Sequence, residues 1–303
     1  MSPLRFDGRV AVVTGAGRGV GRSHAMLLAA KGARVVVADY GAGINGDGSS
    51  SAPADEVVRE ITDSGGQAVA CFASVAEPHG AQAIVDTAVE AFGRIDVVVN
   101  NAGIHDPGLF ETLSRDRFRN MFDVHFYGTV LVTQAAWPHF VAAGYGRIVN
   151  TVSEAMLGGI SELSSYGAAK GAVFGLTRNL ATEGLTHGIR VNAVAPRAYT
   201  RMSASHSDSV AAQLSIPKEV MDTINAGMPP ELCAPAVAFL AHEDCPLNGE
   251  VLQVGMGGVA RIAVVRTPGI VRTPLTAEDI AENLDAVMDI SDAQVTAVTE
   301  MVQ

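Results

Sequence analysis

Three residues in one stretch of the chain have the types and spacing that proton transfer needs. Ser153 lies thirteen positions before Tyr166, and Lys170 follows Tyr166 by four. Residues four apart in a helix share a face, so the Lys170 ammonium can lie beneath the Tyr166 phenol and lower its pKa. A phenol tuned in this way exchanges protons near neutral pH. The alternatives are a buried core tyrosine, a solvated lysine and a serine that only caps a turn.

A second motif lies near the N-terminus. Residues 9–14 (RVAVVT) form a short β-branched run that predicts a strand, and Gly15, Gly19 and Gly21 follow before a helical pattern begins at Ala25. Glycines in such a turn let backbone amides approach a pyrophosphate, and the helix N-terminus favours its negative charge. The order of strand, glycine turn and helix therefore predicts a dinucleotide site.

The next strand carries an acid that bears on the choice of dinucleotide. Residues 34–39 (RVVVAD) predict this strand, and Asp39 ends it about 20 residues after the glycine turn, where a carboxylate can accept both adenosine ribose hydroxyls. We therefore predict NAD rather than NADP as the cofactor. Arg18 in the turn could contact a 2′-phosphate, although Asp39 would repel that group. The alternatives are an ordinary tight turn and a solvated acid.

Strands alternate with helical patterns through about the first 255 residues. The runs at 95–100, 147–151 and 190–195 are typical of buried strands, and this alternation predicts a parallel sheet. Residues 41–53, rich in glycine and serine, and residues 196–230 interrupt the pattern, so we predict loops near the carboxyl ends of the strands, where ligands bind. We expect the second loop to be a mobile lid, with a surface insertion as the alternative.

Composition limits the function classes. The chain has 303 residues, 48% of them hydrophobic, which is enough apolar material for one large core. Its net charge of -11 provides no basic footprint for nucleic acid, and it repels anionic ligands unless basic residues cluster locally. We therefore expect a small-molecule substrate and no nucleic-acid partner.

Other features concern the compartment. No apolar run approaches the roughly 18 residues of a membrane span, and the first residues lack a signal-peptide core. Cys71, Cys233 and Cys245 show no metal-ligand spacing and no even disulfide framework. We expect structural thiols, no bound metal, no membrane association and a cytoplasmic protein. The last residues, 301–303 (MVQ), are not a peroxisomal address of the Ser-Lys-Leu type.

Taken together, the motifs resemble the short-chain dehydrogenase/reductase family. TGAGRGVG at 14–21 and NNAG at 100–103 join the serine, tyrosine and lysine described above, over a match from residue 6 to about 258. The resemblance implies an α/β, Rossmann-type, doubly wound domain with a seven-stranded parallel sheet over residues 1–258. It also implies hydride transfer between NAD and a secondary alcohol or ketone, in a homo-dimer or homo-tetramer.

Within this resemblance each site residue has an implied role. Tyr166 takes the alcohol proton, Ser153 holds the substrate oxygen, and Lys170 assists Tyr166 and binds the nicotinamide ribose. Ser74 and Val75 should approach the adenine. The residues expected to contact the cofactor are Gly15, Arg18, Gly19, Val20, Gly21, Asp39, Ser74, Val75, Asn101, Ala102, Gly103, Tyr166, Lys170, Pro196 and Thr200.

A narrower resemblance concerns the substrate. The chain is similar to the hydroxyacyl-CoA dehydrogenase part of peroxisomal multifunctional enzyme type 2. The similarity lies in the extended loop after Asp39, the stretch NGEVLQVGMGG and the C-terminal extension. This resemblance implies a (3R)-3-hydroxyacyl-CoA substrate, for which Arg197 and Arg201 are candidate anchors or solvated surface residues. A steroid, cyclic alcohol or xenobiotic ketone is the alternative substrate, and a non-catalytic NAD-binding regulator is the alternative from another class.

The chain departs from the family pattern at two positions. His125 in DVHFYG replaces a catalytic asparagine, and Arg197 follows Pro196 where glycine is common. His125 relays protons from Lys170 through water, or it packs there while its backbone carbonyl holds the water. Thr200 should still reach the nicotinamide carboxamide.

Residues 259–303 form a C-terminal extension. A strand-like VARIAVVR is followed by a proline-rich stretch and by predicted helices at 277–288 and 292–301. With about 45 residues the extension can hardly build its own core. We expect it to pack on the body, on a neighbouring subunit or on the lid.

Overall fold

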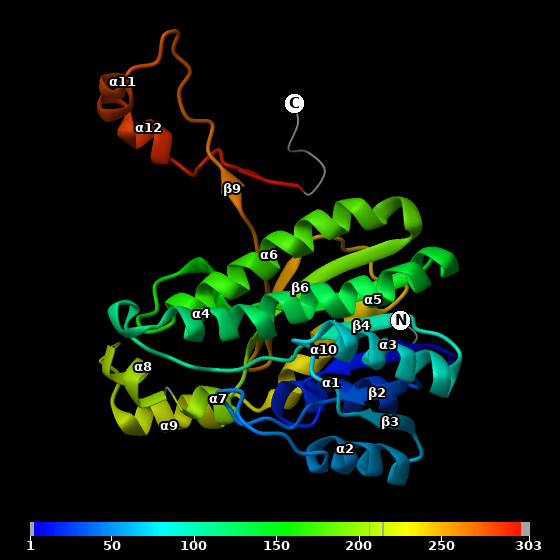
Figure 1. Ribbon diagram of the computed structural model, residues 1–303. Helices are drawn as coiled ribbons and strands as arrows, with labels where there is room; N and C mark the ends of the chain where they lie inside the picture. The colour runs from blue at the N-terminus through cyan, green and yellow to red at the C-terminus, as the bar shows by residue number, and fades with distance from the viewer. Residues whose placement is uncertain (1–2, 206, 214, 298–303) are drawn as a thin grey trace.

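The computed structural model describes residues 3–205, 207–213 and 215–297 (Figure 1). One sheet of eight strands forms the centre, in the order β3-β2-β1-β4-β5-β6-β7-β8. Seven strands pair in parallel, and the eighth pairs antiparallel with β7. The strands are β1 (Val10–Thr14), β2 (Arg34–Ala38), β3 (Gln67–Cys71), β4 (Val97–Asn100), β5 (Gly146–Thr151), β6 (Ile189–Arg197), β7 (Val251–Gly255) and β8 (Gly258–Ile262).

Helices cover both faces of the sheet. Outside residues 196–230 and the C-terminal extension, the α-helices are α1 (Gly19–Ala30), α2 (Ala52–Asp63), α3 (Pro78–Phe92), α4 (Arg115–Phe122), α5 (Gly128–Ala143), α6 (Ser164–Gly184) and α10 (Ala234–Ala241). Short turns of helix are η1 (Phe110–Thr112), η2 (Asp123–Tyr127, a π-helical turn), η3 (Glu154–Leu157), η4 (Leu185–His187) and η5 (Pro230–Cys233). The predicted α/β, Rossmann-type fold is confirmed.

The core consists of two layers, because neighbouring residues of a strand point to opposite faces. Val13 of β1 packs in the same cluster as Leu28 of α1, whereas Val12 packs in the cluster that holds Val132 and Phe140 of α5. All five side chains are buried. Strands buried on both faces read as continuous apolar runs, and for this reason the sequence revealed them.

The strand order opens a crevice between β1 and β4, at the carboxyl ends of these strands. Chain order reverses between β1, which leads to β2 and β3, and its other neighbour β4, which leads to β5 and β6. The connections after β1 and β4 therefore diverge to opposite faces, and a ligand can enter between them. The glycine turn after β1 and the NNAG segment at the end of β4 lie at this point.

Two sequence-based expectations about the sheet and the lid need correction. The sheet has an eighth strand, β8, formed by the start of the segment that we assigned to the extension. Residues 196–230, predicted as a loop, contain three short helices, α7 (Arg201–Ala204), α8 (Ser207–Gln213) and α9 (Lys218–Ala226). Each helix buries at most one residue, Ala211 in α8 and Met221 in α9. So few buried positions leave no apolar periodicity to read.

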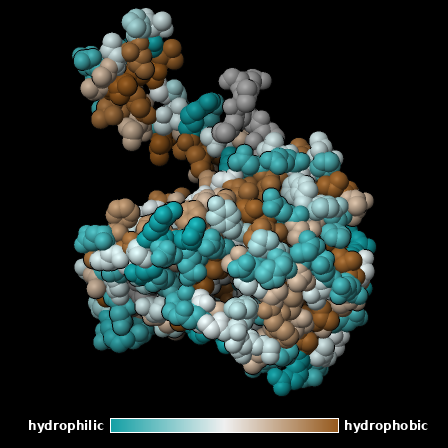
Figure 2. All heavy atoms as spheres, viewed as in Figure 1, coloured by the Kyte–Doolittle hydropathy of each residue, from teal (hydrophilic) through white to brown (hydrophobic). Residues whose placement is uncertain are grey.

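The C-terminal extension leaves the body after β8. Beyond β9 (Val265–Arg266) the chain forms α11 (Ala277–Glu282), α12 (Leu284–Met288) and β10 (Gln294–Val295). Figure 1 shows α11 and α12 apart from the sheet and its covering helices, and Figure 2 shows apolar side chains on this arm facing solvent. Val271, Met288 and Ile290 are among its exposed apolar residues.

The predicted helix at 292–301 is wrong over residues 292–297. Gln294–Val295 pairs antiparallel with β9 instead, and the Thr296 amide donates to the Val264 carbonyl at 2.9 Å. Arg178 of α6 also donates to the Thr296 carbonyl at 2.7 Å. These tertiary hydrogen bonds satisfy the backbone in an extended conformation, which helix propensity alone does not anticipate. Residues 298–301 lie outside the described residues.

No helix among the described residues is long and apolar enough to cross a bilayer. Cys71, Cys233 and Cys245 are free and buried. Burial raises the pKa of the Cys233 thiol to about 11, which leaves it in its unreactive protonated form at neutral pH.

The core also contains a histidine in α1, the helix that follows the glycine turn. His24 in α1 is fully buried, and neither of its ring nitrogens has a hydrogen-bond partner among the described residues. Burial lowers the pKa of His24 from 6.5 to about 3, because the imidazolium would lose its hydration. The native state therefore holds His24 neutral where the unfolded chain binds a proton.

This histidine makes stability dependent on pH. From pH 6.5 down to about 3 the unfolded state binds the extra proton, so the free energy of unfolding falls as pH falls. At pH 5 the expected loss from His24 is about 2 kcal/mol. We predict that His24→Met flattens the change in urea-unfolding free energy between pH 7 and pH 5 by this amount. The exposed His187, replaced by glutamine, is the control, and an unaltered slope in His24→Met would contradict the prediction.

Candidate active site

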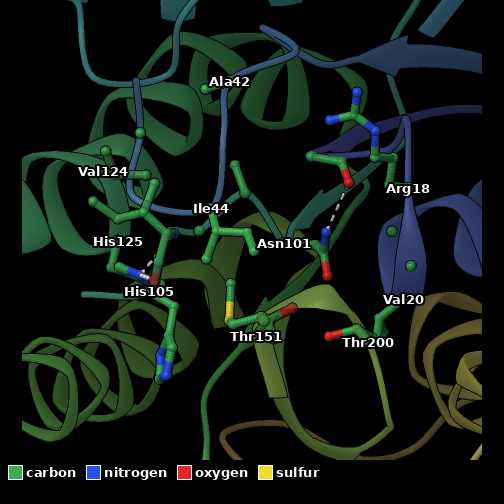
Figure 3. A pocket seen from close by; sticks show the side chains of 18 of the residues that line it. Arg18, Val20, Ala42, Ile44, Asn101, His105, Val124, His125, Thr151 and Thr200 are labelled. Carbon is green, nitrogen blue, oxygen red and sulfur yellow. Dashed lines mark hydrogen bonds between the residues drawn. The ribbon is translucent and has the colours of Figure 1, made fainter. Parts of the chain in front are cut away.

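A cavity of about 710 Å³ lies at the carboxyl ends of the parallel strands (Figure 3). Every residue predicted to contact the cofactor lines it, and so does Ser153. The fold therefore brings together residues that lie more than 180 positions apart in the chain. Their binding roles remain predictions, whereas their convergence on one cavity is a property of the structure.

The glycine turn is shaped for close approach. Gly15 has a φ of +63°, and a Cβ on it would lie 2.8 Å from the Ala102 Cα. A Cβ on Gly21 would overlap the Gly15 carbonyl oxygen. Since α1 begins at Gly19, the first amides of this helix are directed to the cavity without intrahelical partners. Side chains at these positions would collide with the protein's own backbone and force the turn out of this conformation.

Asp39 is held in place at the end of β2. Its Oδ2 accepts the Gly17 amide at 2.7 Å, and its Oδ1 accepts the Gly41 amide at 2.7 Å. Each carboxylate oxygen can accept more than one hydrogen bond, so ribose hydroxyls can still be bound. Arg18 and Arg201 line the same cavity. Burial and then the charge of Arg18 lower the pKa of Arg201, so the two guanidiniums are close enough to repel each other.

Asn101 joins the two halves of the crevice. Its Nδ2 donates to the carbonyls of Thr14, at 3.0 Å, and Gly15, at 3.2 Å. The Thr14 hydroxyl in turn accepts the amides of Asn101 and Ala102 at 3.0 and 3.1 Å. Figure 3 shows Asn101 at the wall between Arg18 and Thr200. Asn101 thus fixes the glycine turn against the end of β4.

Ser153, Tyr166 and Lys170 meet at the other end of the cavity. Tyr166 and Lys170 lie one turn apart on α6, as predicted, and Ser153 precedes η3 just after β5. The Lys170 ammonium donates to the Thr151 carbonyl at 2.6 Å and lies 5.7 Å from the centroid of the Tyr166 ring. Tyr166 and Ser153 share a hydrogen bond between their hydroxyls. Lys170 itself is buried.

The acidities in this cluster differ from the sequence-based expectation. Burial raises the pKa of Tyr166, and the hydrogen bond from Ser153 lowers it only in part. Burial also lowers the pKa of Lys170 to about 7. The net pKa of Tyr166 therefore lies above its ordinary value, contrary to the expectation of a lowered one, because loss of hydration outweighs the favourable hydrogen bond. Lys170 consequently exchanges its proton near neutral pH.

His125 lies behind Tyr166 in the π-helical turn η2. Its ring is buried, 5.2 Å from the Tyr166 ring between centroids, with an interplanar angle of 89°. The ring nitrogen Nε2 lies 3.1 Å from the Ile104 amide and 2.9 Å from the Ile104 carbonyl oxygen. Burial and then the charge of Lys170 place the pKa of His125 well below 6.5, so the ring is neutral.

The backbone of His125 also has a partner. Its carbonyl accepts the Thr129 hydroxyl at 2.8 Å. These contacts explain how the ring packs in this place. Proton relay by the imidazole and water binding by its carbonyl both stay predictions.

The two candidate substrate arginines have different environments. Arg197 makes a bidentate ion pair with Glu154, with both hydrogen bonds at 2.7 Å, and its side chain does not line the large cavity. Arg201 does line the cavity. Of the two, Arg201 is thus the one placed to meet an anionic group.

Several lining residues were missed in the sequence analysis. Ile44 from the loop after β2, His105 after the NNAG segment, and Thr151 at the end of β5 all reach the cavity. The position of His105 and Thr151 next to strand carboxyl ends was the only available signal. Ile44 gave none, because a loop that crosses the crevice has no periodicity.

Comparisons with known proteins give a consistent result. A family model described as short chain dehydrogenase matches residues 9–210. A protein of Mycobacterium tuberculosis, named as a short-chain type dehydrogenase/reductase, is 43% identical over 95% of this chain and 96% of its own length. The peroxisomal multifunctional enzyme type 2 of Mus musculus is 40% identical over 96% of this chain, which spans 38% of the mouse protein.

A solved structure extends this comparison. The structure titled 7α-hydroxysteroid dehydrogenase complexed with NADH and 7-oxo glycochenodeoxycholic acid superposes with a TM-score of 0.71 at 30% sequence identity. The similarity covers 84% of this chain and 95% of that one. Both the cofactor and the ketone in that title are properties of that protein.

Proposed function

This chain belongs to the short-chain dehydrogenase/reductase family, and from that premise we propose that it is an NAD-dependent dehydrogenase of secondary alcohols. The observation that carries the proposal is the convergence of Ser153, Tyr166 and Lys170 on the cavity that also holds Asp39. An NAD-binding regulator would require the end of the cavity with the glycine turn and Asp39, but not the end with Ser153, Tyr166 and Lys170. We therefore favour an enzyme over a regulator.

The residues present fit NAD. The amides of the glycine turn would hold the pyrophosphate, and this turn is closed so tightly that a Cβ on Gly15 or Gly21 would collide with backbone atoms. Asp39 would accept the adenosine ribose hydroxyls and would repel the 2′-phosphate of NADP. Lys170 would bind the nicotinamide ribose and Thr200 the carboxamide. The nicotinamide of bound NAD supplies the acceptor for the hydride.

The mechanism assigns a proton transfer to Tyr166. In the oxidation direction Tyr166, as phenolate, accepts the proton of the alcohol while the carbinol C–H bond breaks and its electron pair leaves with the hydrogen. Ser153 donates to the substrate oxygen and holds it at Tyr166. Lys170 in its cationic form stabilises the phenolate. Because the pKa of Lys170 is about 7, this cation is lost as the pH rises above neutral.

For the substrate we propose a 3-hydroxyacyl thioester. The similarity to peroxisomal multifunctional enzyme type 2 over almost the whole chain supports this class. Arg201, with Arg18, provides positive charge at the cavity for an anionic thioester in a chain of net charge -11. A steroid is the second candidate, supported by the similarity to a hydroxysteroid dehydrogenase.

We further propose a homo-dimer or homo-tetramer in the cytoplasm. The part of the extension beyond β8 would pack on a neighbouring subunit, because α11 and α12 lie off the body of their own chain with apolar side chains exposed. Free buried cysteines suit a reducing compartment.

The test is NADH formation at 340 nm. The panel contains (3R)-3-hydroxybutanoyl-CoA, its 3S epimer, plain secondary alcohols and a 7α-hydroxysteroid, each with NAD and with NADP. We expect turnover of the 3R thioester with NAD. Turnover of the other alcohols alone would retain the dehydrogenase and reject the thioester, and absence of turnover with every alcohol would reject the enzyme in favour of the regulator.

A further inference from the structure

A second imidazole lies at the reactive end of the cavity, and no step of the mechanism uses it. The ring of His105 lies 5.9 Å from the Tyr166 ring between centroids, at an interplanar angle of 84°. Two imidazoles, His105 and His125, therefore meet Tyr166 edge to face. Figure 3 shows both on the side of the pocket away from Arg18. A substrate oxygen bound at Tyr166 would thus have His105 near its neighbouring atoms.

The two imidazoles differ in their surroundings. The Nε2 of His125 is engaged by the backbone of Ile104, and its neutral ring supports Tyr166 from behind. His105 comes from the cavity wall formed by the segment after β4, just beyond the residues predicted to line the cofactor groove. We therefore regard His125 as a packing residue and consider His105 for contact with the substrate.

The backbone fixes the position of His105. Its amide donates to the carbonyl of Ile44 at 2.8 Å, which ties this segment to the loop after β2. The preceding Ile104 is buried against Met121. The next residue, Asp106, directs its carboxylate to Arg117, with hydrogen bonds of 2.6 and 2.5 Å. The segment that carries the imidazole is thus held by contacts on both sides. The carboxylate nearest in sequence, that of Asp106, is already paired with Arg117.

The cavity that His105 lines also has apolar residues in its wall. Ile44, Ile104, Val124 and Leu163 line the cavity with it. An imidazole can donate or accept one hydrogen bond at each ring nitrogen, according to its tautomer. A site that hydrogen-bonds an oxygen of the substrate favours that substrate over an analogue that lacks the oxygen.

We propose that His105 is a specificity-determining residue that hydrogen-bonds a second oxygen of the substrate, two carbons from the reacting carbinol. This inference rests on the proposed function, because Tyr166 must hold the carbinol oxygen. The carbonyl of a 3-hydroxyacyl ester or thioester has this relation to the carbinol, and it accepts the imidazole N–H. A plain secondary alcohol has no such atom and gains nothing from His105.

The test compares two alcohols of equal chain length without coenzyme A. Ethyl (3R)-3-hydroxybutanoate carries the second oxygen, and (R)-2-heptanol lacks it. We expect His105→Leu to lower kcat/KM for the hydroxy ester about tenfold and to leave that for 2-heptanol within about twofold. His105→Asn, which keeps a donor, should recover part of the loss. The exposed His187, replaced by leucine, is the control and should change neither value.

Two results would overturn the inference. An equal fall for both alcohols in His105→Leu would show that His105 only positions Tyr166, and unchanged values for both would show that it meets no substrate. If the unmodified protein oxidises neither of these alcohols nor any alcohol of the panel above, the proposed function fails by itself. The role of His105 is then tested by calorimetry, which measures the affinity of the protein with NAD for ethyl acetoacetate and for 2-heptanone. The inference is overturned if His105→Leu weakens the binding of both ketones equally, or of neither.

Discussion

Tyr166→Phe is expected to lower kcat about 10²- to 10⁴-fold, the usual contribution of a positioned proton donor or acceptor. The substitution removes one hydroxyl and keeps the ring that packs with Ile104, Met121 and Ala169. The fold and the affinity for NADH should therefore persist. Steady-state kinetics with the best alcohol of the panel measure the loss, and quenching of Trp137 fluorescence on NADH titration measures the retained affinity.

A matched variant separates the role of the hydroxyl from a general effect. Tyr127 is half-exposed and does not line the cavity, so Tyr127→Phe should retain the activity of the unmodified protein. If Tyr166→Phe kept turnover within about tenfold, Tyr166 would not be the proton acceptor. If it instead lost NADH affinity as well, the cavity would have collapsed and the kinetic loss would carry no mechanistic meaning.

The second large effect concerns the choice of cofactor. Asp39→Ser should lower kcat/KM with NAD about 100-fold, because two hydrogen bonds from ribose hydroxyls to a charged oxygen are lost. With NADP the same change should raise kcat/KM about tenfold, since the repulsion between the carboxylate and the 2′-phosphate disappears. The ratio of the two values is therefore expected to change by about three orders of magnitude.

The ratio is the informative quantity because Asp39 also accepts the amides of Gly17 and Gly41. If the substitution loosened this loop, it would weaken the binding of NAD and of NADP alike, and the effect would cancel in the ratio. Asp63→Ser, at the exposed end of α2, is the control. A ratio that stays the same in Asp39→Ser would contradict the proposal of NAD and would direct attention to Arg18.

The effect of the histidine in α1 on stability is a separate matter from these active-site changes. His24 lies in the helix that follows the glycine turn but does not line the cavity. Its replacement should alter the acid limb of the stability profile without altering the choice of cofactor. Measurement of both properties in His24→Met would test that independence.

Local sequence was sufficient for much of the scaffold. The apolar β-branched runs at β1, β2, β4, β5 and β6 were predicted to within about two residues, because strands buried on both faces need apolar side chains throughout. The placement of Tyr166 and Lys170 on one helix followed from the period of the α-helix. The glycine turn was readable since the close approach of Gly15 and Gly21 to backbone atoms excludes any side chain.

Other features depended on partners that lie far away in the sequence. The stretch 292–297 was predicted as helix, but pairing of β10 with β9 gives its backbone an extended conformation. His105 is held at the cavity by a hydrogen bond from its amide to the carbonyl of Ile44, which belongs to another loop. A periodic pattern carries no information on such contacts between separate segments.

By itself, the sequence determined the order of strands and helices, the glycine turn and the types of residue available for proton transfer, since these depend on local spacing. Only the tertiary structure decided the acidities of Tyr166 and Lys170, because their pKa values follow from how completely the surrounding elements exclude water. It also decided which polar residues share the cavity, pairing Arg197 with Glu154 and placing His105 beside Tyr166. Burial is a property of the assembled chain, and so is the chemistry that burial controls.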